Sequence, residues 1–123
     1  MATLNDRVYD NGLSVLDTEA NRIDICSQEP TTYAAATSTY TLGNSTSLSI
    51  GAPQDRSGGG REVVVAAITD GSVTSTGTAT HYAIVDTSNS RLLATGSLTA
   101  SQAVTSGNTF TLSSVAIGIP DPA

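Results

Sequence analysis

The sequence predicts an all-β protein: a single, mainly antiparallel β-sandwich or small barrel of seven to eight short strands with extended terminal arms. Three observations lead to this fold class. Short apolar runs are separated by Gly, Asn, Asp and Ser, and these turn signals recur every 8–12 residues. The 123 residues suit one domain, residues 1–123. The core must be built from small aliphatic side chains, because only 26 residues are Leu, Ile, Val or Phe.

The first half of the chain is expected to begin with an N-terminal arm over residues 1–10. Alternation of apolar and polar residues predicts strands over 12–17 and 22–27, joined by a four-residue hairpin loop. Residues 31–41 are compatible either with one helical turn, because they contain three consecutive alanines, or with a strand of alternating threonines. A short strand is predicted over 47–50.

The second half carries clearer strand signals. The glycine triplet within residues 54–60 predicts a flexible surface loop, and the run 62–69 is apolar on both faces, as is typical of a covered central strand. Further strands are expected over 78–86, 91–98 and 109–119, the last with a bulge at 113–114. Two prolines predict an extended C-terminal tail over 119–123.

Charge and composition exclude several functions. The net charge is −6, with five arginines, no lysine and no cluster of basic residues, which argues against binding nucleic acid or an anionic membrane. No apolar run is long enough to span a bilayer, and the first residues lack the apolar segment of a secretory signal, so synthesis in a cytoplasm is expected. The single Cys26 cannot form an intrachain disulfide.

No catalytic, cofactor or metal site is predicted. His81 is the only histidine, and neither a second histidine nor a paired-cysteine motif is present to complete a zinc site. Cys26 reads as a buried apolar residue. Thr74, Thr76, Thr78 and Thr80 alternate as an ice-binding ladder would, but a single ladder is better explained by the β propensity of threonine.

Two parts of the chain are similar to small virion proteins of tailed bacteriophages. The first part is Asn5–Leu13 with Leu16–Asn21 and Ser27–Pro30, and the second is Ala79–Asp86 with Leu92–Gly96 and Val104–Phe110. The resemblance is to minor head proteins of the capsid decoration type. It implies a non-enzymatic protein without cofactors that binds the major capsid protein on the outer surface of the head, stabilises the shell and forms a homotrimer.

The residues expected at the protein interface lie in the N-terminal arm and in the glycine-rich loop. Arginine and tyrosine are enriched at interfaces. The residues expected to make the contact are Leu4, Arg7, Val8, Tyr9, Arg56 and Arg61. Two alternatives stay open. The first is a head–tail, tail or fibre component of the virion. The second is a glycan- or receptor-binding β-sandwich module, although the chain has no tryptophan, the residue on which sugars often stack.

Overall fold

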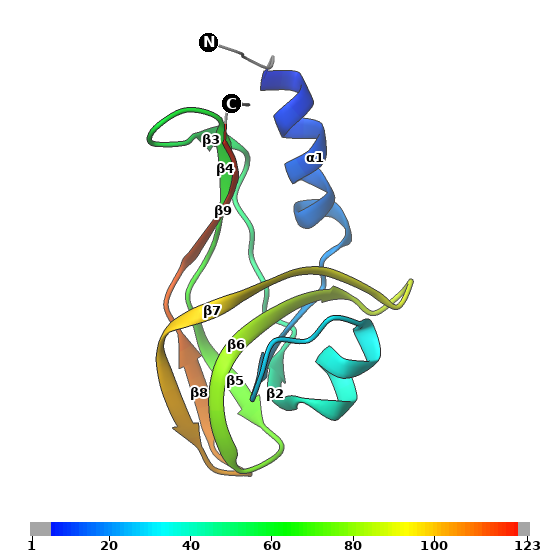
Figure 1. Cartoon of the computed structure of the whole chain (residues 1–123), viewed down its shortest axis with the longest axis vertical. Coiled ribbons are helices and arrows are strands. Elements are labelled where there is room, and N and C mark those ends of the chain that lie inside the picture. The colour runs from blue at the N-terminus through cyan, green and yellow to red at the C-terminus, as the bar shows by residue number, and fades with distance from the viewer. Residues whose placement is uncertain (1–5, 121–123) are drawn as a thin grey trace. The chain divides into compact units, whose positions relative to one another are not determined.

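The computed structural model describes residues 6–120, and the side chains of residues 10–120. The protein is mostly β, as the sequence predicts, with a curled, antiparallel half-barrel sheet and a second, small sheet (Figure 1). The described strands are β1 (Arg22–Cys26), β2 (Thr41–Ser45), β3 (Gln54–Asp55), β4 (Arg61–Val65), β5 (Ile68–Val73), β6 (Gly77–Asp86), β7 (Arg91–Val104), β8 (Thr109–Leu112) and β9 (Val115–Ile119). Two helical segments complete the fold, α1 (Asp6–Glu19) and η1 (Ala35–Thr39), a single turn of π-helix.

The described chain forms two compact units, and it passes from one to the other four times. The first unit contains residues 6–19, 49–67 and 113–120, and the second contains 20–48 and 68–112. The single domain expected over residues 1–123 stays a prediction. It would require the two units to unfold together. Each unit is described separately below.

In the first unit, α1 packs on a three-stranded sheet of order β3-β4-β9. Val63 and Val65 of β4 are buried, and Leu13 and Leu16, one helical turn apart, are the buried side chains of the described part of α1. Gly12 of α1 lies over β9, because a Cβ atom at this position would stand 3.5 Å from Cδ1 of Ile119.

The helix corrects two expectations at the start of the chain. Residues 12–17 are not a strand but part of α1, and the extended arm expected over residues 1–10 is helical from Asp6 onward; residues 1–5 lie outside the described part. Leu13 and Leu16 are three residues apart, so in a helix they share the face that is buried here. The strand predicted over residues 12–17 is therefore wrong, because the buried residues follow the repeat of a helix and not the two-residue repeat of a strand.

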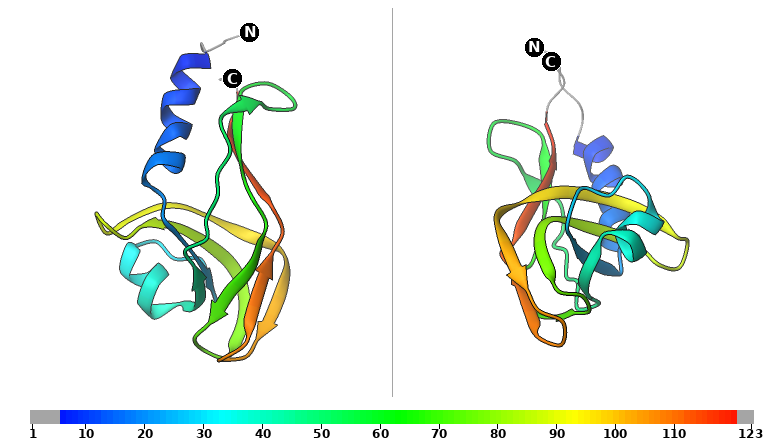
Figure 2. Two further views of the ribbon diagram at one scale, coloured as in Figure 1. Left: turned by 180° about the vertical axis from the view of Figure 1, so that it is seen from behind. Right: turned by 60° about the horizontal axis from the view of Figure 1, so that its bottom comes forward.

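In the second unit, six antiparallel strands follow the order β7-β6-β1-β2-β5-β8. The sheet curls until its two edge strands meet at one end, where the side-chain amide of Gln102 in β7 donates to the carbonyl oxygen of Thr111 in β8 (2.9 Å; Figure 2). The strand predicted over 22–27 and that over 78–86 are confirmed as β1 and β6, and they pair over five residues from Arg22↔Val85 to Cys26↔His81.

Strand β1 is covered on both faces. Ile23 and Ile25 point to one face with Tyr82 and Ile84, which lie opposite them in the ladder. The other face is covered by the segment around η1: Cys26 packs in a cluster with Ala36, Ala83 and Val85, with Tyr33, Tyr40 and Leu92 at its margin. Residues 31–41 thus resolve into η1 followed by the start of β2.

The prediction of a central strand over 62–69, covered on both faces, is wrong. This run splits into β4 and β5, which lie in different sheets, with Ala66 and Ala67 exposed between them. The strand expected over 109–119 divides in the same way at Ser113 and Ser114, where a bulge was predicted. Residues 47–50 form only an isolated bridge at Ile50, and Ile119 belongs to β9 and not to a tail.

Two glycines lie opposite aromatic rings in the larger sheet. A Cβ at Gly96 would stand 2.6 Å from the ring of Tyr82, its ladder partner, and a Cβ at Gly71 would overlap the ring of its partner Phe110. The rings therefore occupy the space that a side chain would fill. Gly71 lies inside β5.

Candidate functional site

The predicted interface residues of the N-terminal segment fall on α1 or before it. Leu4 lies outside the described residues. Arg7, Val8 and Tyr9 lie in the first turns of α1, and their side chains are not among those described. The expectation that these three residues belong to an extended arm is therefore wrong, whereas their role in an interface stays a prediction.

Arg61 joins the β3–β4 hairpin to α1. Its Nε donates to Oδ1 of Asp10 on the helix (3.0 Å), its Nη1 to Oδ1 of Asp55 (2.8 Å), and its Nη2 to the carbonyl oxygen of Pro53 (3.2 Å). Only 17% of the Arg61 side chain is exposed. The guanidinium is thus largely occupied within the chain, and Arg61 positions the hairpin against the helix.

Arg56 lies at the other end of the loop between β3 and β4 and shapes this glycine-rich loop. Its Nη1 donates to the carbonyl oxygen of Gly59 (3.1 Å), and its backbone N–H donates to the carbonyl oxygen of Gly60 (3.1 Å). Gly58, Gly59 and Gly60 all have φ between 90° and 106°, which side chains other than glycine rarely adopt. The triplet is thus required by the turn between β3 and β4, whereas the flexibility predicted for residues 54–60 stays a prediction.

Gly60 has a second reason to lack a side chain. A Cβ at this position would overlap the carbonyl oxygen of Ile119 and lie 2.9 Å from Cα of Pro120. The tip of the hairpin therefore lies directly on the end of β9. Arg56, Arg61 and the end of β9 form one surface of the first unit.

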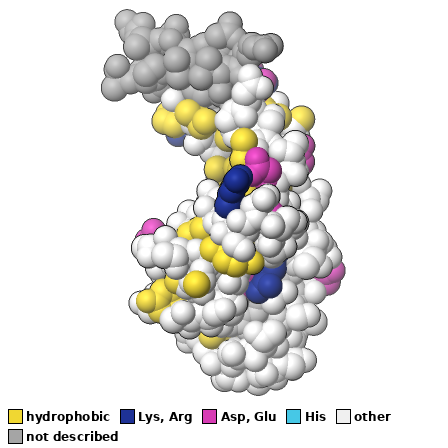
Figure 3. All heavy atoms as spheres, turned by 90° about the vertical axis from the view of Figure 1, so that its right-hand side faces the viewer, with side chains coloured by type: hydrophobic (Ala, Val, Ile, Leu, Met, Phe, Trp, Pro, Cys, Tyr) yellow, Lys and Arg dark blue, Asp and Glu magenta, His cyan; other side chains and the backbone are white. Residues whose placement is uncertain are grey.

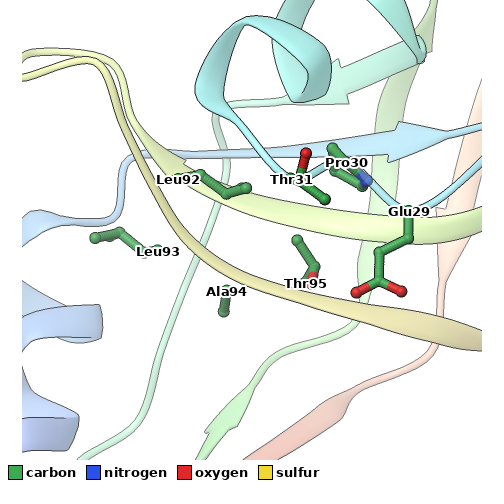
Figure 4. Close-up of a pocket in the computed structure, with 7 residues that line it drawn as sticks. All are labelled: Glu29, Pro30, Thr31, Leu92, Leu93, Ala94 and Thr95. Atoms are coloured by element: carbon green, nitrogen blue, oxygen red, sulfur yellow. The ribbon is translucent and has the colours of Figure 1, made fainter.

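A shallow hollow of about 360 Å³ lies on the second unit, between the segment after β1 and the first half of β7. It is lined by Glu29, Pro30, Thr31, Leu92, Leu93, Ala94 and Thr95. Figure 4 shows Leu92 beside Pro30 and Thr31, and Thr95 beside the carboxylate of Glu29. One carboxylate, two hydroxyl groups and an apolar wall suit a polar ligand or an extended peptide, and sequence reasoning missed this place because its two segments are distant in the chain.

His81 takes part in a chain of hydrogen bonds on β6. The hydroxyl of Thr80 donates to the carbonyl oxygen of Ser27 (3.0 Å), so its oxygen is left to accept from Nδ1–H of His81 (2.9 Å). Nε2 then faces the hydroxyl of Ser97 at 3.4 Å. These contacts link β6 to β7 and to the segment after β1, and the expectation that His81 is not catalytic stays a prediction.

The tyrosines whose side chains are described serve the core. Tyr33 and Tyr40 are half-buried against the cluster around Cys26, and Tyr82 is buried over Gly96. Burial also raises the pKa of Tyr82. These three rings are therefore engaged within the second unit.

Cys26 follows the expectation from sequence, whereas the threonine row only partly does. Cys26 is fully buried, burial raises the pKa of its thiol to about 12, and its Sγ donates to the carbonyl oxygen of Ala36 (3.6 Å). The threonine row is interrupted, because Thr74 and Thr76 lie in the connection before β6, where Thr76 Oγ1 accepts from the N–H of Ser106.

Among the described residues, the buried side-chain nitrogen and oxygen atoms all have hydrogen-bond partners. In this part of the chain no three His, Cys, Asp or Glu side chains are grouped so that they could hold a metal ion. Neither described helix has the length and hydropathy needed to cross a membrane.

The fold and these surfaces define a mostly β protein with two antiparallel sheets. No protein-family model matches the chain, and no curated protein and no solved structure is significantly similar to it.

Proposed function

We propose that the protein is a non-enzymatic structural protein of a tailed-bacteriophage virion, a decoration protein that binds the outer surface of the head as a homotrimer. The observation that carries the proposal is the scarcity of charge along the outer strands. No charged residue occurs from Leu92 to Val104 in β7 or from Val115 to Ile119 in β9. The centres of protein interfaces are depleted in charged residues, because desolvating a charge is costly.

The charged side chains inside the fold support the same proposal. Arg22 and Asp24 pair with each other, and Arg61 pairs with Asp10 and Asp55, so these charges form ion pairs within the chain. Neutral side chains and backbone cover most of the face shown in Figure 3, with a few charged groups among them. Such a surface suits many weak contacts with other protein subunits.

The mechanism of stabilisation follows from linkage. A protein that binds the assembled shell and not its separated subunits lowers the free energy of the shell by an amount that grows with its concentration. In this proposal the contact with the major capsid protein includes Leu4, Arg7, Val8, Tyr9, Arg56 and Arg61, and Arg61 also positions the hairpin that carries Arg56. The protein is made in the host cytoplasm and acts on the virion surface.

Co-sedimentation with undecorated capsids tests this proposal. We expect saturable binding with hundreds of copies per particle and an increase in the temperature at which the capsids release their contents. Arg56→Ala should weaken binding, whereas Arg91→Ala, an exposed arginine at the start of β7, serves as the matched control. Absence of saturable binding by the folded wild-type protein overturns the proposal, and a copy number of tens or fewer favours the head–tail, tail or fibre alternative.

The hollow beside Glu29 supports the second alternative, a glycan- or receptor-binding module. Its carboxylate and hydroxyl groups lie next to an apolar wall, which is the combination that recognises the two faces of a sugar. A glycan array with the wild-type protein and with Glu29→Gln tests this role. Binding that is lost in the variant supports it, and a blank array argues against it.

A further inference from the structure

Strand β9 offers an unprotected edge. It is the last strand of the β3-β4-β9 sheet, and its five residues pair with β4 without a bulge, from Arg61↔Ile119 to Val65↔Val115. Among the described residues, no strand pairs with its other side. Sheet edges in natural proteins are usually blocked by charges, prolines or bulges, and β9 contains none of these between Val115 and Ile119.

The apolar side chains on one face of this sheet are buried in β4 but only partly buried in the edge strand β9. Val63 and Val65 of β4 are 0% and 2% exposed. Their ladder partners Ile117 and Val115, and Ile119 beyond them, share the same face but remain partly exposed. The edge strand therefore has both unpaired backbone groups and apolar side chains whose burial is incomplete.

The pattern of β9 is symmetric about Ile117. The residues alternate large and small in the order Val, Ala, Ile, Gly, Ile. If two copies of the strand pair antiparallel about this point, Ile117 lies opposite Ile117, Val115 opposite Ile119, and Ala116 opposite Gly118. Large side chains then meet on one face and small ones on the other, and β9 itself contributes no charged side chain to the contact, although each chain carries a net charge of −6.

We propose that β9 is a homotypic interaction surface, and that it pairs antiparallel with β9 of a second copy of the chain about a two-fold axis at Ile117. The product is a continuous sheet of order β3-β4-β9-β9-β4-β3. Such a contact is isologous and closes at two copies, so it is separate from any trimer interface. Five paired residues make a small contact, which gains strength where many copies are held close together. The inference holds independently of the virion role.

Cysteine cross-linking of the full-length chain tests the pairing and its register. Ile117→Cys places two thiols directly opposite each other across the axis, so mild oxidation should give a disulfide-linked dimer. Ala116→Cys is the matched control, because its two thiols would be diagonal neighbours about 7–8 Å apart, beyond the reach of a disulfide. We expect at least about fivefold more dimer from Ile117→Cys. The wild type controls for Cys26, which is buried.

A second pair of variants covers the case in which Ile117→Cys disturbs the covered face. Ala116→Cys mixed with a size-tagged Gly118→Cys should give the mixed dimer in preference to either homodimer, since these positions face each other and are exposed. A Cβ at Gly118 would stand 2.9 Å from Cδ of the flexible Arg56 side chain and 3.2 Å from the carbonyl oxygen of Arg61, so the Arg56 side chain must move and the backbone must give by a few tenths of an ångström. Equal yields from all variants, or no dimer from the folded variants at high protein concentration, overturn the proposal.

Discussion

Asp24 is the most consequential buried charge in the second unit. Its side chain is completely buried in β1, Oδ1 accepts from Nε of Arg22 (2.7 Å), and Oδ2 accepts from Nη2 of Arg22 (2.8 Å) and from the hydroxyl of Thr41 (2.7 Å). The hydrogen bond to Asp24 raises the pKa of Arg22. Removing either partner of this fork should destabilise the fold, but by unequal amounts.

The inequality follows from exposure. The side chain of Arg22 is 24% exposed and that of Asp24 is 0% exposed. Arg22→Ala leaves a buried carboxylate with one hydrogen bond, and losing a partner in this way costs about 3–5 kcal/mol. Asp24→Ala leaves a guanidinium that water can still reach, so we expect about 2–3 kcal/mol. Thr41→Val removes a single hydrogen bond to a charged group, at about 1–2 kcal/mol.

Equilibrium urea unfolding of the three variants measures these differences. We expect the order Arg22→Ala, then Asp24→Ala, then Thr41→Val, with an unchanged dependence on urea. The double variant that lacks both charges should be no less stable than Arg22→Ala alone, because it leaves no buried charge unpaired. If Arg22→Ala costs less than Asp24→Ala, the argument from unequal burial is wrong.

Three further predictions concern single contacts. Gly96→Val should lower the free energy of unfolding by about 1–3 kcal/mol, because a side chain there overlaps the ring of Tyr82, and thermal unfolding should show the loss. The hydrogen bond from Asn89 to Asp86 (2.8 Å), followed by the backbone N–H groups of the turn, lowers the pKa of Asp86. The stability that this hydrogen bond contributes is fully present above the ordinary pKa of 3.8 and is lost as the pH falls through the lower pKa of the folded protein. Asn89→Ala should therefore move the midpoint of acid unfolding, measured by circular dichroism, to higher pH. An unchanged midpoint refutes this. Cys26, with a pKa of about 12, should react with a thiol reagent at pH 8 at least about 100-fold more slowly in the folded protein than in urea, and comparable rates would contradict its burial.

Strand signals with local causes were readable from the sequence. β1 and β6 contain dense β-branched and apolar residues, and both lie where the pattern placed them. Cys26 was expected to be a buried apolar residue, and it is fully buried.

Other features depend on contacts between distant segments. The sequence of 12–17 fits a short strand as well as a helix, and the helix is selected by burial of Leu13 and Leu16 in the first unit. No local signal shows that 62–69 and 109–119 each divide between two sheets. The hollow beside Glu29 likewise exists only because β7 returns to the segment after β1.

The all-β class and the small aliphatic core were determined by composition and by the spacing of apolar runs, because both express the local preferences of the chain. Tertiary structure decided which charged side chains pair within the chain. Arg61 is held by Asp10, which lies 51 positions away in the sequence, while its role in an interface stays a prediction. Tertiary structure also left β9 as an uncovered edge, because the order of strands in a sheet is set by long-range pairing that no local pattern encodes.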